Sequence, residues 1–498
     1  TPSSMGNAGG RGINLAERSS PKLERNNMKK YLLALYFFPA IFICQEAFDF
    51  SGNLNYYSIS RLSDGSLINQ PFRIANFIIQ KEHTNFSIYS HLAMEYRIPS
   101  DSHFLDNTSS QDFSWDLREL YLTWQLKNGE IRIGKQIQIW GSTDGNSPVD
   151  NLNAYDYYYL FESGADQKLG TFSMASDIYL GSWKLGLSIS PIHYTNRLPL
   201  NDPEFPVDLP VSPRSSQVIE VENPLELGGY ISKSFNRGDI TLSYFDGYDR
   251  LFNLSGINLF SGTNSNDTYL DTVFSYRKTT SLGMGGILFI GDLTLRGEYV
   301  VFNTKDNTKN VENKYDNQIL QGIYNVIGDS ITTIEYTHTF ETQADYYQYT
   351  LQFEYELPWD LQIAGQWFQY DTLNLSIKQA PDPGDLPLFD DSEDEFIPEE
   401  YFSPGIGVPI ASLTKNVLLL DLTKIFYDNR LELNLRTMMD QVHSGKLMEI
   451  GLGYDINESL KSYLAINSII GDDSQNHRYT FNHMKDFSHI RLELKYFY

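Results

Sequence analysis

The sequence predicts an all-β fold of antiparallel strands, and three observations lead to this prediction. Apolar and polar residues alternate with a period of two in segment after segment, which is typical of strands with one apolar and one polar face. Turn residues separate these segments, and no amphipathic helical pattern of useful length interrupts them. The one long apolar run, residues 31–44, spans about 14 residues and is too short for a membrane-spanning helix.

The last residues of the chain show the alternation most clearly. The apolar and aromatic positions are Ile490, Leu492, Leu494, Tyr496 and Tyr498, and the positions between them are charged except for Phe497. This ending resembles the C-terminal signal of bacterial outer-membrane β-barrels, whose closing strand ends in an aromatic residue. The resemblance implies that Tyr498, Tyr496 and Leu494 are an assembly signal for the barrel assembly machinery. An edge strand of a soluble sheet is the alternative that these residues alone leave open.

The same alternation recurs in the middle of the chain, in residues 293–301, 347–357 and 431–436. Very short turns predict two hairpins, 227–236 with 239–248 and 446–454 with 460–469. A soluble sheet would bury its apolar faces against a second layer, which the sequence does not supply. We therefore predict a transmembrane antiparallel β-barrel of about 18 to 20 strands over residues 48–498, a single domain with no plug.

The residues before the first strand predict export. Lys29 and Lys30, the apolar run and Ala47 together form the pattern of a secretory signal peptide, residues 28–47. Residues 1–27 show no strand or helix pattern and are expected to be a disordered upstream extension. Cys44 is the single cysteine, and Ile43 before it fits a lipoprotein signal poorly. The expected location is the outer membrane of a Gram-negative bacterium.

Composition restricts the partners. The formal net charge of −25 disfavours nucleic-acid binding, because phosphate contacts need clustered positive charge. The 34 Tyr and 30 Phe residues suit the aromatic girdles of a barrel. The expected partners are outer-membrane lipid, lipopolysaccharide, the barrel assembly machinery and a small hydrophilic solute. No cofactor is expected, and a homo-oligomer is compatible with the sequence.

Three stretches are expected to be long loops: residues 141–167, 191–224 and 379–408. The second is rich in proline and cannot be regular strand. The third carries an acidic run whose weak candidate metal ligands are Asp390, Asp391, Glu393, Asp394 and Glu395. It lacks the ligand order of an EF-hand, so a solvated acidic surface loop is the simpler interpretation.

The most distinctive internal segment is residues 131–141, followed by the loop residues Asp144 and Asp150. The alternation places Arg132, Gln136, Gln138 and Trp140 on one strand face, opposite the isoleucines. Its Gly-basic-Gln step and Trp-Gly pair resemble alginate-export-like and related uncharacterised outer-membrane barrels, which implies a channel or export function. Arg132, Gln136, Gln138, Trp140, Asp144 and Asp150 are therefore the candidate solute-contacting residues. The alternative is that the polar residues only hydrate the wall and that Trp140 is a girdle anchor.

Lys135 falls on the apolar face of this segment. Either a bulge at Gly134 redirects it, or it lies near the membrane interface. The pattern alone leaves both open.

These observations favour a porin or channel for passive or selective diffusion of small hydrophilic solutes such as saccharides or ions. A structural or adhesive barrel that binds partners through surface loops is the second hypothesis. A barrel enzyme is the third, because His338 and His443 fall in no recognisable catalytic motif and no catalytic residue is predicted. A secreted soluble carbohydrate-binding β protein is the fourth.

The acidic loop gives a first testable prediction. Excising residues 382–400 should leave a folded barrel, because the closure entropy of a surface loop changes only slowly with its length. Heat-modifiable migration in detergent gels measures the folded fraction. A variant that no longer folds would mean that these residues belong to the barrel wall.

Overall fold

The computed structural model describes residues 48–97, 113–160, 164–200, 202, 204, 213, 217–262, 268–306, 331–377, 402–475 and 479–498. Residues Asp49–Tyr498 form one compact unit. The expected extension and signal peptide lie outside the described residues, and so do the five candidate metal ligands between Asp390 and Glu395.

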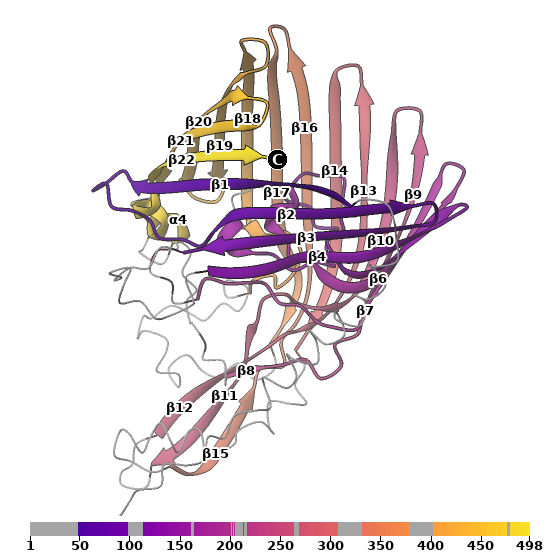
Figure 1. The fold of residues 1–498 in the computed structure, drawn as a ribbon. Helices are drawn as coiled ribbons and strands as arrows, with labels where there is room; N and C mark the ends of the chain where they lie inside the picture. Colours follow the sequence, from indigo (N-terminus) through magenta and orange to yellow (C-terminus); the bar gives the residue numbers. More distant parts are fainter. Residues whose placement is uncertain are drawn as a thin grey trace, which may run out of the picture. The chain divides into compact units, whose positions relative to one another are not determined.

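Eighteen strands form one antiparallel sheet that closes on itself (Figure 1). They are β1 (Asp49–Arg61), β2 (Phe72–His83), β3 (Phe86–Tyr96), β4 (Phe113–Leu126), β5 (Gly129–Gln136), β6 (Thr171–Leu180), β7 (Trp183–Ser190), β9 (Glu226–Phe235), β10 (Gly238–Tyr248), β13 (Lys278–Ile290), β14 (Leu293–Lys305), β16 (Gln343–Leu357), β17 (Leu361–Ser376), β18 (Asn416–Phe426), β19 (Leu431–Asp440), β20 (Lys446–Asn457), β21 (Leu460–Ile470) and β22 (His489–Phe497). Each pairs with the next in this order, and β22 pairs with β1. The predicted barrel is confirmed, at the lower end of the predicted strand number.

A second, four-stranded sheet was not predicted. It contains β8 (Val218–Ile219), β11 (Asn253–Gly262), β12 (Thr268–Ser275) and β15 (Ile331–Thr339). These strands lie in the connections after β7, β10 and β14. Sequence periodicity detects such strands as well as it detects wall strands, and it does not say which sheet they join.

The seam between β1 and β22 runs from Asn53 opposite Phe497 to Arg61 opposite His489. Tyr498 extends it by one residue, because its backbone N–H and carbonyl exchange hydrogen bonds of 3.2 and 3.3 Å with Gly52. The Tyr498 hydroxyl also donates to the Asn76 carbonyl at 3.2 Å. A Cβ at Gly52 would lie 2.6 Å from this hydroxyl oxygen, so the residue must be small.

The two ends of the barrel differ. Turns of two to four residues join β2–β3, β4–β5, β6–β7, β9–β10, β13–β14, β16–β17, β18–β19 and β20–β21. These turns lie at the end where β1 begins and β22 ends, which we call the short-turn end. The other connections, including all three predicted long loops, lie at the opposite, long-loop end. Successive connections of antiparallel strands alternate between the two ends, and the even strand number brings both ends of the barrel chain to the short-turn end.

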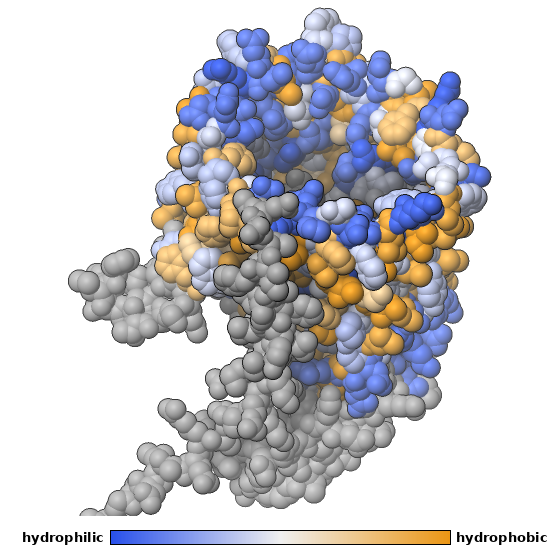
Figure 2. Space-filling view, turned by 45° about the vertical axis from the view of Figure 1, so that its right-hand side comes forward, coloured by the Kyte–Doolittle hydropathy of each residue, from blue (hydrophilic) through white to orange (hydrophobic). Residues whose placement is uncertain are grey.

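The wall separates an apolar outer face from a mostly polar inner one. In β16, Tyr346, Gln348 and Thr350 are fully buried, whereas Leu351 and Phe353 between the inward positions are exposed. Hydrophobic residues gather on the outer flank in Figure 2, with hydrophilic residues above and below them. Exposed aromatic residues near the short turns include Phe86, Trp124, Tyr179, Trp183, Phe235 and Trp359. The predicted division of faces is confirmed.

Among the described residues, no helix is both long and apolar enough to cross a membrane, and helix α4 (Thr480–His483) is four residues long.

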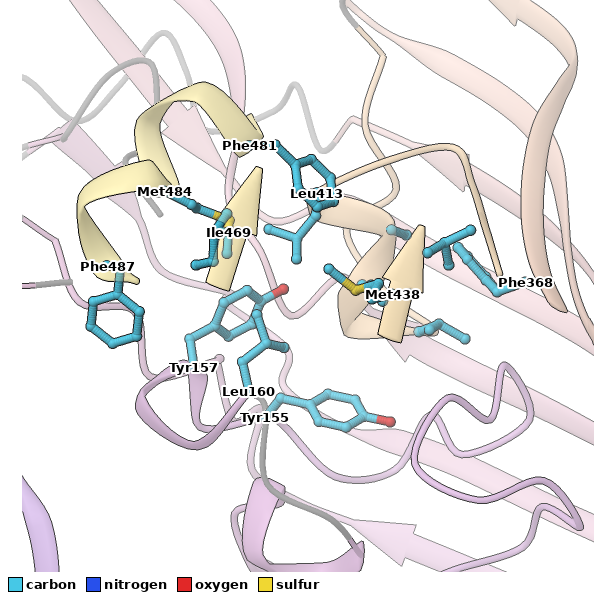
Figure 3. Packing of buried hydrophobic residues seen from close by; sticks show 14 of the residues in the cluster. Tyr155, Tyr157, Leu160, Phe368, Leu413, Met438, Ile469, Phe481, Met484 and Phe487 are labelled. Atoms are coloured by element: carbon cyan, nitrogen blue, oxygen red, sulfur yellow. The ribbon is translucent and has the colours of Figure 1, made fainter. Parts of the chain in front are cut away.

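Loops fold inward and pack in the barrel interior. The larger apolar cluster joins wall residues such as Phe368, Met438 and Ile469 to loop residues such as Tyr157 and Phe481 (Figure 3). A second cluster joins Val149, Leu152, Phe402 and Ile406 from loops to Phe245, Val300, Phe302 and Tyr346 from the wall. The interior is therefore filled at this level by loops from several connections and not by a separate domain.

The seam gives the second prediction. Deleting Tyr498 should lower the yield of folded barrel, because it removes two backbone hydrogen bonds, each worth about 0.5–1.5 kcal/mol, and the contact with Asn76. Tyr498→Phe keeps the backbone bonds and the ring and should fold nearly as well. Heat-modifiable gel migration after refolding compares the two. Equal yields for the deletion and the Phe variant would contradict the assigned role of the seam.

Candidate functional site

The connection after β5 leaves the wall and enters the lumen. Strand β5 ends at Gln136, and the next two backbone N–H groups are taken by side chains. Ile137 N–H donates to Glu119 Oε1 at 2.8 Å, and Gln138 N–H donates to Asn153 Oδ1 at 2.8 Å. We call residues 137–170 the inward loop; it contains the 3₁₀ helices η3 (Tyr157–Tyr159) and η4 (Gly164–Gln167).

This geometry corrects the predicted strand. Arg132 and Gln136 belong to β5, but Gln138 and Trp140 lie beyond its end, so the four do not share one strand face. The reason is that side-chain acceptors replace the ladder hydrogen bonds from Ile137 onward. The predicted bounds 141–167 are therefore too narrow, because the loop begins at residue 137 and ends at residue 170.

The two glutamines are buried, and their side-chain N–H groups hold the point where the chain leaves the wall. Gln136 Nε2 donates to the Ser173 carbonyl at 3.1 Å. Gln138 Nε2 donates to Ser173 Oγ at 2.9 Å and to Ser188 Oγ at 3.0 Å. Their predicted contact with a solute stays a prediction, and their position favours a structural role.

Trp140 packs inside the barrel, so the girdle alternative for it is wrong. Its ring centroid lies 5.3 Å from that of Tyr230, which is an inward residue of β9. A Cβ at Gly228 would lie 2.5 Å from Trp140 Cη2. The glycine therefore makes the space that the indole occupies.

Arg132 lies on the lumen face, as the alternation predicts. Its side chain is 22% exposed, with Nη2 3.2 Å from Asp177 Oδ2 and Nε 3.4 Å from Glu130 Oε1. Asp177 also lies 3.4 Å from Lys184 Nζ and accepts from the Tyr230 hydroxyl at 2.7 Å. We call these residues the Asp177 cluster.

Lys135 continues the face of Ile131 and Ile133, since β5 shows no register shift at Gly134. The bulge alternative is therefore wrong. Its Nζ donates to the Leu117 carbonyl and lies 3.7 Å from Asp116 Oδ1. These acceptors satisfy a charge that would otherwise lie on the apolar face.

A second charged cluster, which sequence analysis missed, lies on the wall between β18 and β22. Glu449 is 3.7 Å from Arg436 Nη1 and 3.3 Å from Arg491 Nη2, and it accepts from the Tyr463 hydroxyl at 3.0 Å. Arg436 Nε also pairs with Asp421 at 2.6 Å. We call these residues the Glu449 cluster. The polar positions of the alternating segment 431–436 could have indicated it.

Two carboxylates fix the first half of the inward loop. Asp150 Oδ1 accepts the N–H groups of Trp140 at 2.5 Å and Gly141 at 2.8 Å, and Oδ2 pairs with Lys168 Nζ at 2.7 Å. The predicted residue Asp150 is thus buried within the loop itself. The second carboxylate, Glu298 of β14, accepts from Thr143 N–H at 2.8 Å and Ser147 Oγ at 2.6 Å.

The loop tip, residues 144–146, rests on three neighbouring strands. Asp144 Oδ1 accepts from Arg296 Nη1 at 2.9 Å, and its Oδ2 accepts from Gln352 Nε2 at 2.8 Å. Asn146 Nδ2 donates to Gln366 Oε1 at 2.7 Å, and its carbonyl accepts from Thr350 Oγ1 at 2.7 Å. We call the receiving wall residues the loop seat: Arg296, Glu298, Thr350, Gln352 and Gln366. The Asp144 side chain nevertheless stays 70% exposed.

Ion pairs anchor the second half of the loop to β2, β3 and the next connection. Arg197 Nη1 lies 2.8 Å from Glu95 Oε2 and 3.2 Å from Asp156 Oδ2. Arg73 lies 3.5 Å from Asp156 Oδ2, and its guanidinium carbon is 3.7 Å from the centre of the Tyr159 ring. Burial raises the pKa of the Asp156 carboxyl, although Arg197 and Arg73 act in the opposite direction.

A segment after the acidic run closes over the inward loop. The Gln348 side chain donates to the Ile406 carbonyl at 3.0 Å and accepts from Val408 N–H at 2.9 Å. Arg250 N–H donates to the Gly405 carbonyl at 2.7 Å. The pocket left between this segment and Tyr155 has a volume of about 10 Å³, room for about one water molecule. The two segments are therefore packed together.

Candidate metal ligands and histidines were the remaining polar groups of interest in the described residues. No group of three or more His, Cys, Asp or Glu residues there could hold a metal ion. His443 packs edge-on against Tyr479, with ring centroids 5.0 Å apart.

No family model and no curated protein matches the chain. Among solved structures, the outer membrane protein opdK from Pseudomonas aeruginosa is similar at 10% identity and a TM-score of 0.48, over 91% of this chain and 99% of that chain. OccAB2 from Acinetobacter baumannii is similar at 11% identity and a TM-score of 0.44, over 91% of this chain and 98% of that chain. Salmonella typhi OmpF is similar at 9% identity and a TM-score of 0.37, over 91% of this chain and 97% of that chain. These similarities concern the fold alone, and the resemblance to alginate-export-like barrels stays unconfirmed.

Two neighbours on β5 give the third prediction. Ile133 is 47% exposed on the outer face, so Ile133→Arg should destabilise a bilayer-inserted barrel by about 2–4 kcal/mol. Arg132→Gln on the lumen face removes only partly exposed ion pairs and should cost at most about 1 kcal/mol. Equilibrium unfolding in lipid vesicles measures both. Equal losses would show that the register of β5 is wrong.

Proposed function

We propose that this protein is an outer-membrane porin through which small hydrophilic solutes diffuse. The observation that carries the proposal is a closed 18-stranded barrel with an apolar outer face and a lumen that contains a braced loop. A closed barrel satisfies its backbone hydrogen bonds within the wall, which a bilayer requires of a spanning β structure. A barrel of this strand number is wide enough for an aqueous channel.

The inward loop and the charged clusters would set what passes. Charges at a constriction act in a low-dielectric surrounding, where they change local ion concentrations strongly. Asp144 at the loop tip and Arg436 on β19, two strands along the wall from β17, are the more exposed of the charges named above. Arg132 is a further solute-contacting candidate. Saccharides and ions are compatible with such a path, and the chemistry is transport and not catalysis.

The proposed surroundings follow from the two faces. Outer-membrane lipid would contact the apolar flank, and lipopolysaccharide the long-loop end. The C-terminal strand with Leu494, Tyr496 and Tyr498 would be the signal for the barrel assembly machinery. Leu494 and Tyr496 are exposed on the outer face of β22, where a partner or lipid can reach them.

A second candidate function is binding of a partner at the long-loop end. The observation that favours it is the four-stranded sheet of β8, β11, β12 and β15 in the connections at that end. Adhesion and diffusion are not exclusive, because the sheet and the barrel wall use different strands.

Planar-bilayer recording gives the fourth prediction. Purified protein should produce stepwise conductance increases, because each inserted barrel adds one aqueous path. Heat-denatured protein from the same preparation is the control. Folded, inserted barrels that carry no current would rule out the porin proposal and leave the adhesive one. Swelling of liposomes in sugars, amino acids and salts would then define the solute class.

A further inference from the structure

We propose that Glu298 positions the tip of the inward loop and thereby places the Asp144 carboxylate in the permeation path. This inference rests on the proposed pore function for its electrical consequence. Glu298 does not touch Asp144. It acts through the loop backbone, so it is a positioning residue.

The contacts of Glu298 lie on both sides of the tip. Before the tip, Oε1 accepts from the backbone N–H groups of Ser142 and Thr143, the latter at 2.8 Å. After the tip, Oε2 accepts from Ser147 Oγ at 2.6 Å and from Val149 N–H at 3.5 Å. One side chain of β14 thus fixes the loop segments on both sides of the tip, residues 144–146.

Burial makes these contacts strong. Glu298 is 3% exposed, and a buried carboxylate costs several kcal/mol unless donors satisfy it. Among the described residues, no Lys or Arg lies within 4.0 Å of it, so loop donors provide its stabilisation. Hydrogen bonds to an ionised acceptor are about twice as strong as neutral ones. If the loop withdrew, the Glu298 carboxylate would lose every one of these hydrogen bonds.

The loop is shaped to approach this residue. A Cβ at Gly141 would lie 2.7 Å from Glu298 Oε1, so a larger residue there would push the loop off the carboxylate. On β13, a Cβ at Gly285 would lie 2.9 Å from Glu298 Cγ. Glycines on the loop and on the neighbouring strand therefore leave room for the Glu298 side chain.

The tip itself depends on weaker support. Arg296 and Gln352 contact Asp144 directly through the ends of long side chains, and Arg296 is partly exposed whereas Gln352 is buried. Asp144 remains 70% exposed. Without Glu298, we expect residues 142–149 to move and the Asp144 charge to lose its fixed place.

Reversal potentials in planar bilayers test this coupling with Asp144→Asn, Glu298→Ala and the double variant. In the otherwise unchanged protein, Asp144→Asn should lower the cation-over-anion permeability ratio about twofold, because one fixed charge is lost. In the Glu298→Ala background the same change should have no effect. Glu298→Gln keeps one acceptor oxygen for Ser142 and Thr143 and should retain part of the coupling.

Glu449→Ala is the matched control. Glu449 is also a buried carboxylate on the lumen wall, at 7% exposure, but its named contacts are wall residues. In that background the effect of Asp144→Asn should persist. The inference would be overturned if Asp144→Asn changed the permeability ratio equally in the Glu298→Ala and Glu449→Ala backgrounds. It would also be overturned if Asp144→Asn had no effect in the unchanged protein.

A spin label supplies a readout that does not need conduction. Cys44 is the single native cysteine, so Asp144→Cys in a Cys44→Ser protein takes one label in the barrel. The electron paramagnetic resonance spectrum should show an immobilised label. Its lines should sharpen with Glu298→Ala and should not change with Glu449→Ala. Folding is checked by heat-modifiable migration. Absence of current with this spectral pattern would refute the pore and keep Glu298 as the positioning residue, whereas an unchanged spectrum would refute the positioning.

Discussion

The pairing of β1 with β22 is the constraint from which the rest of the structure follows. An open sheet of this length would expose the N–H and carbonyl groups of two edges, and a bilayer offers no partners for them. Closure removes both edges and places the beginning of β1 beside Tyr498. With an even number of antiparallel strands, both ends of the barrel chain lie at the short-turn end, opposite all the long connections. The inward loop can therefore enter the lumen only from the long-loop end.

Closure at 18 strands creates a second requirement. Side chains fill the interior of barrels of about eight strands, and wider barrels must hold loops or water. The inward loop meets this requirement, but it lacks a ladder to satisfy its backbone N–H groups. Asp150 and Glu298 supply acceptors, and Gln348 does the same for the segment over the loop. The burial of these three side chains is thus tied to the presence of loop backbone in the lumen.

The sequence was sufficient for the wall and insufficient for its contents. Period-two alternation identified strands such as β16, β20 and β22, because each wall residue faces either outward or inward. The same rule failed at Gln138 and Trp140, because Glu119 and Asn153 end the strand earlier than the pattern does. Glu298 was not recognised, since an inward Glu looks alike whether it meets water or a loop. Its partner Ser147 is 151 residues away, and no local pattern reports such a contact.

Net charge is likewise a poor guide to the lumen. A value of −25 suggests a preference for cations, yet Asp177 and Glu449 each hold two cationic side chains and a tyrosine hydroxyl. Glu298 is occupied by the loop. In the proposed pore, ions would therefore respond less to the number of carboxylates than to those whose charge is both exposed and fixed. Asp144 combines these properties, because its side chain is 70% exposed while the loop on both sides of it is held by Glu298. The selectivity of such a barrel would then depend on a hydrogen-bonded wall residue that no ion touches.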